Sequence, residues 1–249
     1  MATFTYINER KYICWTVEEY IKQFKEFYQV RNVAFMITLA GRGLALDEIE
    51  KQLKSGNGEI YDEFLAFNNV GGNTFYQETH VALSLIGFVG RDTCSGVCFP
   101  VKTDCPQDIS LVDLEVQLED NSGYDCVLKS GGEEEIYYQI KSVDESRDGG
   151  EFTAENFLKK IQTSLNKYRD EKMILTYLLR PSKPRNSYDE FYPMMEEVSH
   201  ALGDNLTVKD IIFLARKDIE NYQLIKVYKE LVIEEVKVED SMQAVVRNV

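Results

Sequence analysis

Three polar residues stand in a segment that is otherwise rich in β-strand residues. They are Asp125 in SGYDCVL and Gln139 with Lys141 in YYQIKSV, and Gly131-Gly132 lies between the two runs. Carboxylate and amide oxygens are ligands that Mg²⁺ accepts, and an ammonium group can stabilise negative charge that develops during a reaction. Together these residue types can support the metal-assisted hydrolysis of a phosphate ester.

The double glycine is typical of a turn between two strands that pair as an antiparallel hairpin. If the turn centres near residue 132, Asp125 lies opposite Gln139. Because side chains alternate between the two faces of a strand, Lys141 then shares one face with this pair. The opposite face is apolar or aromatic and consists of Cys126, Leu128, Ile136, Tyr138 and Ile140. The hairpin therefore predicts that a carboxylate, an amide and an ammonium group meet on a solvent-open face.

Each of the three polar residues also has a simpler interpretation. An aspartate just before a strand often caps a turn, and a lysine two residues after a glutamine is common on a half-exposed strand. A fold can also lose its activity and keep the same sheet. The alternative is therefore a binding protein that has no catalytic role.

The pattern of Asp125, Gln139 and Lys141 resembles the PD-(D/E)xK nuclease superfamily, whose sites combine an Asp on one strand with (Glu, Asp or Gln)-x-Lys on the next. It is most similar to the Mrr-like restriction endonuclease branch, in which a Gly stands two positions before the Asp and a Gln replaces the second acid. Gly123 fits this branch, whereas Tyr124 stands where the family has its proline. The resemblance spans roughly residues 108–230, and the helix and strand expected after the hairpin fit the order of the family core.

The resemblance implies a metal-dependent deoxyribonuclease of the type II restriction endonuclease kind, with DNA as its partner and Mg²⁺ or Mn²⁺ as its cofactor. Asp125 would bind the metal, and Gln139 would supply an amide oxygen or orient a water molecule. The Ile140 carbonyl would be a further ligand, and Lys141 would position the attacking water. Restriction or anti-phage defence is the implied role, and cutting both strands of a duplex implies a homodimer. The alternatives are an RNA substrate, or a catalytically inactive fold that binds nucleic acid or protein.

The acid that the family places in the preceding helix has no single match. Glu78 in FYQETHVALSLIGF is the first candidate and Glu63 the second. Asp113, Glu115 or Glu119 on the segment before the hairpin can supply the charge instead.

Strand and helix patterns alternate after Pro106, which predicts an α/β (α+β) domain with a mixed central sheet flanked by helices. The predicted strands are SLVDLEVQLED, YDCVLKSG, EEIYYQIKSV, KMILTYLLR, DIIFLARK and YQLIKVYKELVIEEV. The predicted helices cover Phe152–Arg169 and about Phe191–Leu202. This second half, residues 106–249, is the predicted PD-(D/E)xK-like catalytic domain.

The first half, residues 1–105, is predicted to be a separate and mostly helical domain. A capping box of Thr16 and Glu19 opens one helix, and further helices are expected over 33–40, 47–55, 59–67 and 74–87. Residues 30–102 resemble a winged helix-turn-helix module that reads DNA, with LSLIGFVGRD and VCFPV as the wing hairpin. A plain small helical bundle is the alternative interpretation.

The composition indicates an ordinary folded protein: 249 residues are 44% apolar, and the formal net charge is −14. Such a charge opposes non-specific attraction to nucleic acid, so binding requires local basic patches. Arg180, Lys183 and Arg185 on a loop that contains two prolines form the candidate nucleic-acid-binding patch.

The five cysteines are an odd number in a chain whose first residues, MATFTYINERKY, do not resemble a signal peptide. We therefore expect reduced thiols and a cytoplasmic protein. No apolar run approaches the roughly 20 residues of a membrane helix.

Overall fold

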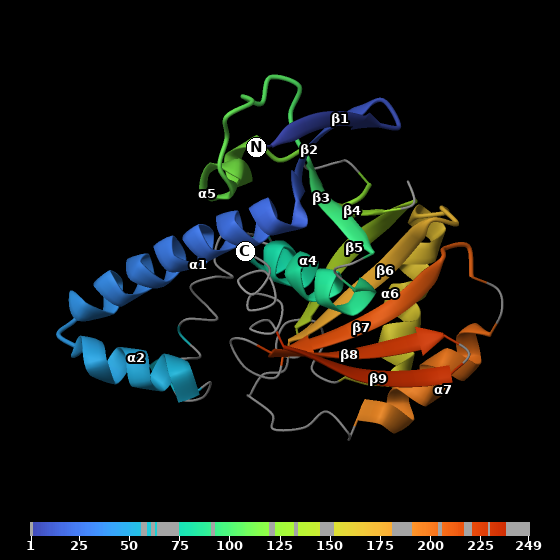
Figure 1. Cartoon of the computed structure of the whole chain (residues 1–249). Coiled ribbons are helices and arrows are strands. Elements are labelled where there is room, and N and C mark those ends of the chain that lie inside the picture. The colour runs from blue at the N-terminus through green and yellow to red at the C-terminus, as the bar shows by residue number, and fades with distance from the viewer. Residues whose placement is uncertain are drawn as a thin grey trace.

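The computed structural model describes residues 2–55, 59–60, 63, 75–90, 93–119, 123–131, 134–144, 152–180, 191–203, 206–216, 221–228 and 230–237. Within these ranges the chain builds one mixed sheet of nine strands, which lie side by side in the order of the sequence (Figure 1). The strands are β1 (Thr3–Ile7), β2 (Arg10–Thr16), β3 (Cys94–Pro100), β4 (Cys126–Ser130), β5 (Glu135–Asp144), β6 (Met173–Arg180), β7 (Asp210–Arg216), β8 (Asn221–Tyr228) and β9 (Glu230–Lys237).

The pairing changes direction twice across the sheet. Strands β1 to β5 pair antiparallel, β5, β6 and β7 pair parallel, and β7, β8 and β9 pair antiparallel again. The two parallel steps need crossover connections, and these contain the helices α6 (Ala154–Lys167) and α7 (Tyr192–Leu202). The predicted mixed central sheet with flanking helices is thus confirmed.

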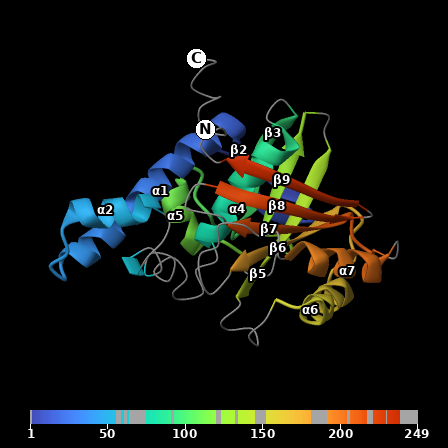
Figure 2. The same cartoon turned by 90° about the horizontal axis from the view of Figure 1, so that it is seen from below.

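Helices cover both faces of the sheet (Figures 1 and 2). The longer helices α1 (Val17–Ala40) and α4 (Phe75–Val89) and the short α5 (Leu111–Leu114) pack on one face, and α6 and α7 pack on the other. Helix α2 (Leu46–Ser55) follows α1 and packs against it. In the part of the chain that the structure describes, no helix is long and apolar enough to cross a membrane.

Most elements predicted for the second half are confirmed, and two are wrong. The segment SLVDLEVQLED is not a strand but α5 followed by a 3-10 turn at Glu115–Gln117. Leu111 and Leu114 are buried at helical spacing, and Ser110 Oγ donates to Asp113 Oδ2 at 2.8 Å. The last predicted strand is two strands, β8 and β9, which form a hairpin.

The first half differs more from its prediction. Thr16 caps α1 as expected, accepting a hydrogen bond from the Glu19 N–H at 3.3 Å, but α1 continues to Ala40 and includes the second predicted helix. The proposed wing hairpin is wrong, because its first arm belongs to α4 and its second arm, β3, pairs with β2 and β4. The sheet also contains strands from both sides of residue 105, so the predicted domain boundary does not coincide with a break in the sheet. The predicted helix over 59–67 lies largely outside the described residues.

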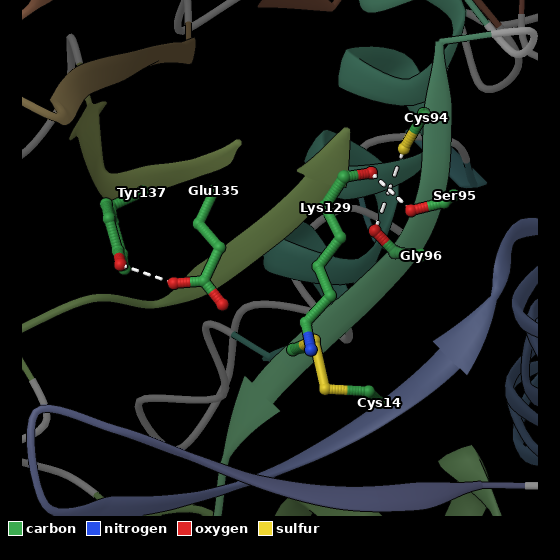
Figure 3. Close-up of a disulfide and its surroundings, with 8 residues drawn as sticks. Cys14, Cys94, Ser95, Gly96, Lys129, Glu135 and Tyr137 are labelled. Atoms are coloured by element: carbon green, nitrogen blue, oxygen red, sulfur yellow. Dashed lines mark hydrogen bonds between the residues drawn. A yellow bond between two sulfur atoms is a disulfide. The ribbon is translucent and has the colours of Figure 1, made fainter. Parts of the chain in front are cut away.

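The expectation that all five thiols are reduced is also wrong. Cys14 on β2 and Cys98 on β3 are direct cross-strand partners and form a disulfide (Figure 3). The other three cysteines, Cys94, Cys105 and Cys126, are free and buried.

Candidate functional site

The hairpin that carries the predicted site has the predicted register. Strands β4 and β5 pair antiparallel, from Cys126 opposite Tyr138 to Lys129 opposite Glu135. Extending this register by one residue places Asp125 opposite Gln139. The Asp125 N–H donates to the Tyr138 carbonyl at 2.9 Å, so the chain is already held against β5 at this residue.

The Asp125 carboxylate contacts β5 directly. Gln139 Nε2 donates to Asp125 Oδ2 at 2.6 Å, and the backbone N–H of Ile140 donates to the same oxygen. The Asp125 side chain thus accepts a hydrogen bond from the backbone of β5, at the position just before β4 begins. The carboxylate is therefore fixed in orientation by one amide side chain and one peptide group.

Two lysines act on this carboxylate. Burial raises the pKa of the Asp125 carboxyl from 3.8 to about 6, whereas the Ile140 N–H and the charges of Lys141 and Lys167 lower it. Lys141 lies on β5, two residues after Gln139 and on the same face, and Lys167 is the last residue of α6. Asp125 and Gln139 therefore meet as predicted, whereas Lys141 acts on the carboxylate only through its charge and, among the described residues, forms no ion pair with it within 4 Å.

The ring of Tyr168 lies close to both lysines. The Nζ atoms of Lys141 and Lys167 lie 5.5 Å and 5.0 Å from the centroid of the Tyr168 ring, which is within the reach of a cation–π contact. Tyr168 follows α6 immediately and caps it through a hydrogen bond from its N–H to the Ser164 carbonyl. The end of α6 therefore forms one wall of the candidate site.

The site is less open to solvent than the sequence predicts. Gln139 is only 3% exposed, and Asp125 and Lys141 are half-buried. The reason is the crossover helix α6, whose apolar residues Phe157, Ile161 and Leu165 join the core on this face. The opposite face of the hairpin is apolar as predicted: Cys126, Leu128, Tyr138 and Ile140 belong to the core under α1 and α4, and Ile136 packs against it.

The hydrogen bonds leave two oxygens of the site available. Among the described residues, both hydrogen bonds to the Asp125 carboxylate end on Oδ2 and none on Oδ1. Gln139 uses its amide nitrogen, and in the same ranges its Oε1 accepts no hydrogen bond. One carboxylate oxygen and one neutral oxygen on adjacent strands fit a Mg²⁺ ion that takes its remaining ligands from water and from a substrate phosphate. They do not form a closed protein cage.

Among the residues that the structure describes, no group of three or more His, Cys, Asp or Glu side chains could hold a metal ion. A metal ion at this site would therefore bind to Asp125, to Gln139 and to ligands outside the described residues. For Ile140, the structure shows its N–H at Asp125, whereas the predicted ligand is its carbonyl oxygen.

The candidates for the helix acid lie in different places. Glu78 is on α4. Burial is the main cause that raises the pKa of the Cys126 thiol, and the charges of Asp125 and Glu78 raise it further. The neighbouring Gln77 accepts a hydrogen bond from Ser142 of β5 at 2.6 Å. Glu63 instead forms an exposed ion pair with Arg42 at 2.8 Å. Both links of α4 to the hairpin lie on its apolar face, under α1 and α4, and not on the face that carries Asp125, Gln139 and Lys141.

No described contact joins the remaining candidate acids, Asp113, Glu115 and Glu119, to Asp125. Asp113 is exposed and accepts a hydrogen bond from Ser110. The side chains of Arg180, Lys183 and Arg185 lie outside the described residues.

Sequence reasoning did not identify Tyr168 as part of the site, since its place beside Lys141 depends on where α6 ends.

Comparisons with protein-family models, with curated proteins and with solved structures find no match for this chain.

Proposed function

We propose that this protein is a Mg²⁺-dependent or Mn²⁺-dependent DNA endonuclease, whose site is formed by Asp125, Gln139 and Lys141. The observation that carries this proposal is the contact of Asp125 with Gln139 across β4 and β5, with the charge of Lys141 beside it. The order of elements adds support. The hairpin β4–β5 is followed by α6 and by the parallel strand β6, as the resemblance to the PD-(D/E)xK superfamily leads us to expect.

The reaction is the hydrolysis of a phosphodiester. A water oxygen attacks the phosphorus, the bond to the leaving oxygen breaks, and the products are a phosphate monoester and a hydroxyl. A bound divalent cation supplies charge neutralisation and lowers the pKa of the water. Asp125 Oδ1 would hold this cation, because Gln139 and the Ile140 N–H bind the other oxygen. Lys141 orients the water and stabilises the negative charge of the transition state.

The substrate must reach a protein with a formal charge of −14. Lys141 and Lys167 supply local positive charge at the site, and Tyr168 keeps both ammonium groups in place. DNA rather than RNA is what the resemblance implies, as is a role in restriction or anti-phage defence. We expect a homodimer, because one site in each chain cuts one strand of a duplex.

The competing function is a binding module without catalysis. The bonds of Asp125 to Gln139 and to the Ile140 N–H are also those of a carboxylate that only terminates a strand. In that case the hairpin would keep its geometry, and the protein would bind nucleic acid or a protein partner without cutting.

The experiment that separates the two functions is the incubation of supercoiled plasmid with the wild-type protein and Mg²⁺ or Mn²⁺. We expect nicked or linear DNA from the wild type and at least a hundredfold slower conversion by Lys141→Ala. Lys129→Ala is the matched control, since Lys129 is a half-buried lysine of the same hairpin, on β4. A folded wild type that leaves plasmid and RNA intact with both metals would favour the binding module.

A further inference from the structure

A pocket of about 350 Å³ lies beside the candidate site. Three segments build it: the turn between β1 and β2, the residues just before β4, and the end of α6. Its lining includes Arg10, Tyr12, Tyr124, Lys167, Arg169 and Asp170. Tyr124 precedes Asp125, and Lys167 acts on the Asp125 carboxylate, so the pocket adjoins the site. Its volume is at the lower end of the roughly 300–1,000 Å³ of small-ligand sites.

The lining is positively charged in a strongly acidic protein. Arg10, Lys167 and Arg169 contribute three formal positive charges and Asp170 contributes one negative charge, which leaves +2. The Asp170 carboxylate accepts hydrogen bonds from the Tyr124 hydroxyl and from the Lys172 N–H. The positive charge of the lining therefore favours an anion, and the carboxylates of Glu119 and Glu135, which also act on Tyr12, reduce this effect.

A buried hydroxyl in this lining has no partner. Tyr12 is fully buried, and among the described residues its hydroxyl makes no hydrogen bond. Burial raises the pKa of this phenol, and the charge of Arg10 opposes the shift. A buried polar group without a partner is costly, and a ligand that reached this hydroxyl would supply the missing acceptor or donor.

The walls of the pocket are tied to one another. Asn8 and Glu9 form a two-residue turn with φ values of 50° and 67°, and Ile7 pairs with Arg10 across it. Asn8 Nδ2 donates to the Tyr124 hydroxyl at 3.5 Å, and this hydroxyl in turn donates to Asp170. The three segments thus form one connected frame that exists before a ligand binds.

We propose that this pocket binds the terminal phosphate of a nucleic-acid strand together with its nucleotide. A phosphate monoester carries about two negative charges, whereas each internal phosphodiester carries only one, so the positive lining favours the monoester. The volume suits one nucleotide, and the half-buried ring of Tyr124 offers a surface on which a base can stack. This inference rests on the proposed function, because the monoester is also the product of hydrolysis at Asp125.

The test measures the binding of fluorescent single-stranded oligonucleotides in EDTA, where no cleavage occurs. One strand carries a 5′-phosphate, one a 3′-phosphate, and one has hydroxyls at both ends. We expect the wild type to bind one of the phosphorylated strands at least tenfold more tightly than the hydroxyl strand. Arg169→Gln should remove most of this preference, and Lys22→Gln, an equal loss of charge on the exposed surface of α1, should preserve it.

A second variant separates binding from folding. Tyr12→Phe removes the hydroxyl that lacks a partner, so we expect an unchanged or higher melting temperature together with at least a threefold weaker preference for the phosphorylated end. Equal affinity of the wild type for all three strands would overturn the proposal, as would a preference that survives Arg169→Gln and Tyr12→Phe together.

The outcomes also separate this inference from the proposed function. If the wild type prefers a phosphorylated end but does not cut plasmid, the proposed pocket is supported and the proposed nuclease activity is refuted. If the wild type cuts plasmid but shows no preference among the three strands, the nuclease activity is supported and end binding by the pocket is refuted.

Discussion

Gln139 Nε2 donates a hydrogen bond to Asp125 Oδ2 at 2.6 Å, between a residue of β5 and the residue just before β4. The pairing is unusual because neither partner brings a positive charge to neutralise a half-buried carboxylate. The carboxylate is fixed in orientation but remains poorly compensated, with a pKa raised to about 6. A divalent cation at its second oxygen would provide this compensation.

The raised pKa of Asp125 predicts how the stability of the protein depends on pH. The folded state binds this proton with a pKa of about 6 and the unfolded state with a pKa near 3.8, so between these values the folded state holds more protons. The free energy of unfolding therefore falls as pH rises from about 4 to about 6, by on the order of 3 kcal/mol, and remains lower above that range. Urea denaturation at several pH values measures this.

Asp125→Asn is the variant that isolates the effect of this one group. It should keep the hydrogen-bond geometry and lose this part of the pH dependence, so it should be more stable than the wild type at pH 7 and not at pH 4. If the free energy of unfolding of the two proteins changes equally between about pH 4 and about pH 6, Asp125 does not titrate as described.

A metal ion that binds at Asp125 should stabilise the folded protein. At a concentration of 100 times the dissociation constant, the gain is about 2.7 kcal/mol, or about 5 to 10 °C in Tm for a chain of this size. Differential scanning calorimetry with and without Mn²⁺ measures this gain. Asp125→Asn should lose it, and an equal gain in wild type and variant would place the ion elsewhere.

The same measurement tests the helix acid. If Glu78 completes the site, Glu78→Gln should reduce the shift caused by Mn²⁺. Glu63→Gln should leave it unchanged, since Glu63 pairs with Arg42.

Replacing the amide by a second acid should lower stability without metal and increase the stabilisation that a metal ion provides. Gln139→Glu removes the donor to Asp125 and places two carboxylates side by side, so without metal we expect a loss on the order of 1 to 3 kcal/mol. With Mn²⁺ the second anion should make the thermal shift larger than in the wild type. Gln162→Glu, the same change on the exposed side of α6, is the control. A smaller metal shift in Gln139→Glu would argue against Gln139 as a ligand.

The disulfide predicts a stability that depends on reducing agent. Cys14 and Cys98 are 84 residues apart, and for a loop of this length the chain-entropy model gives about 4 to 5 kcal/mol. Dithiothreitol should therefore lower the Tm of the wild type and leave that of Cys14→Ser unchanged. Alkylation of the unfolded and unreduced protein should modify three of the five cysteines. Modification of all five would contradict the disulfide.

The successes and errors of sequence reasoning have a common physical cause, the separation of the partners along the chain. The opposition of Asp125 and Gln139 was predictable because one short turn fixes the register of β4 and β5. Strand β2 instead pairs with β3, more than 80 residues later, and no local pattern specifies this pairing. Both the disulfide and the continuity of the sheet across residue 105 depend on it.

Burial was misjudged for a related reason. The polar face of the hairpin was expected to be open, but the crossover between parallel strands β5 and β6 places α6 over that face. The pocket was not predictable, because Arg10 and Arg169 come together only when the β1–β2 turn meets the end of α6.

The central claim is that Asp125, Gln139 and Lys141 form a site that binds a divalent cation, and the most direct test is a crystal of the protein soaked in Mn²⁺. We expect an anomalous density peak at a coordination distance of about 2.1 Å from Asp125 Oδ1, with the Gln139 Oε1 as a second ligand and Lys141 nearby. No peak at Asp125 under saturating Mn²⁺, or a peak only at a distant surface carboxylate, would contradict it.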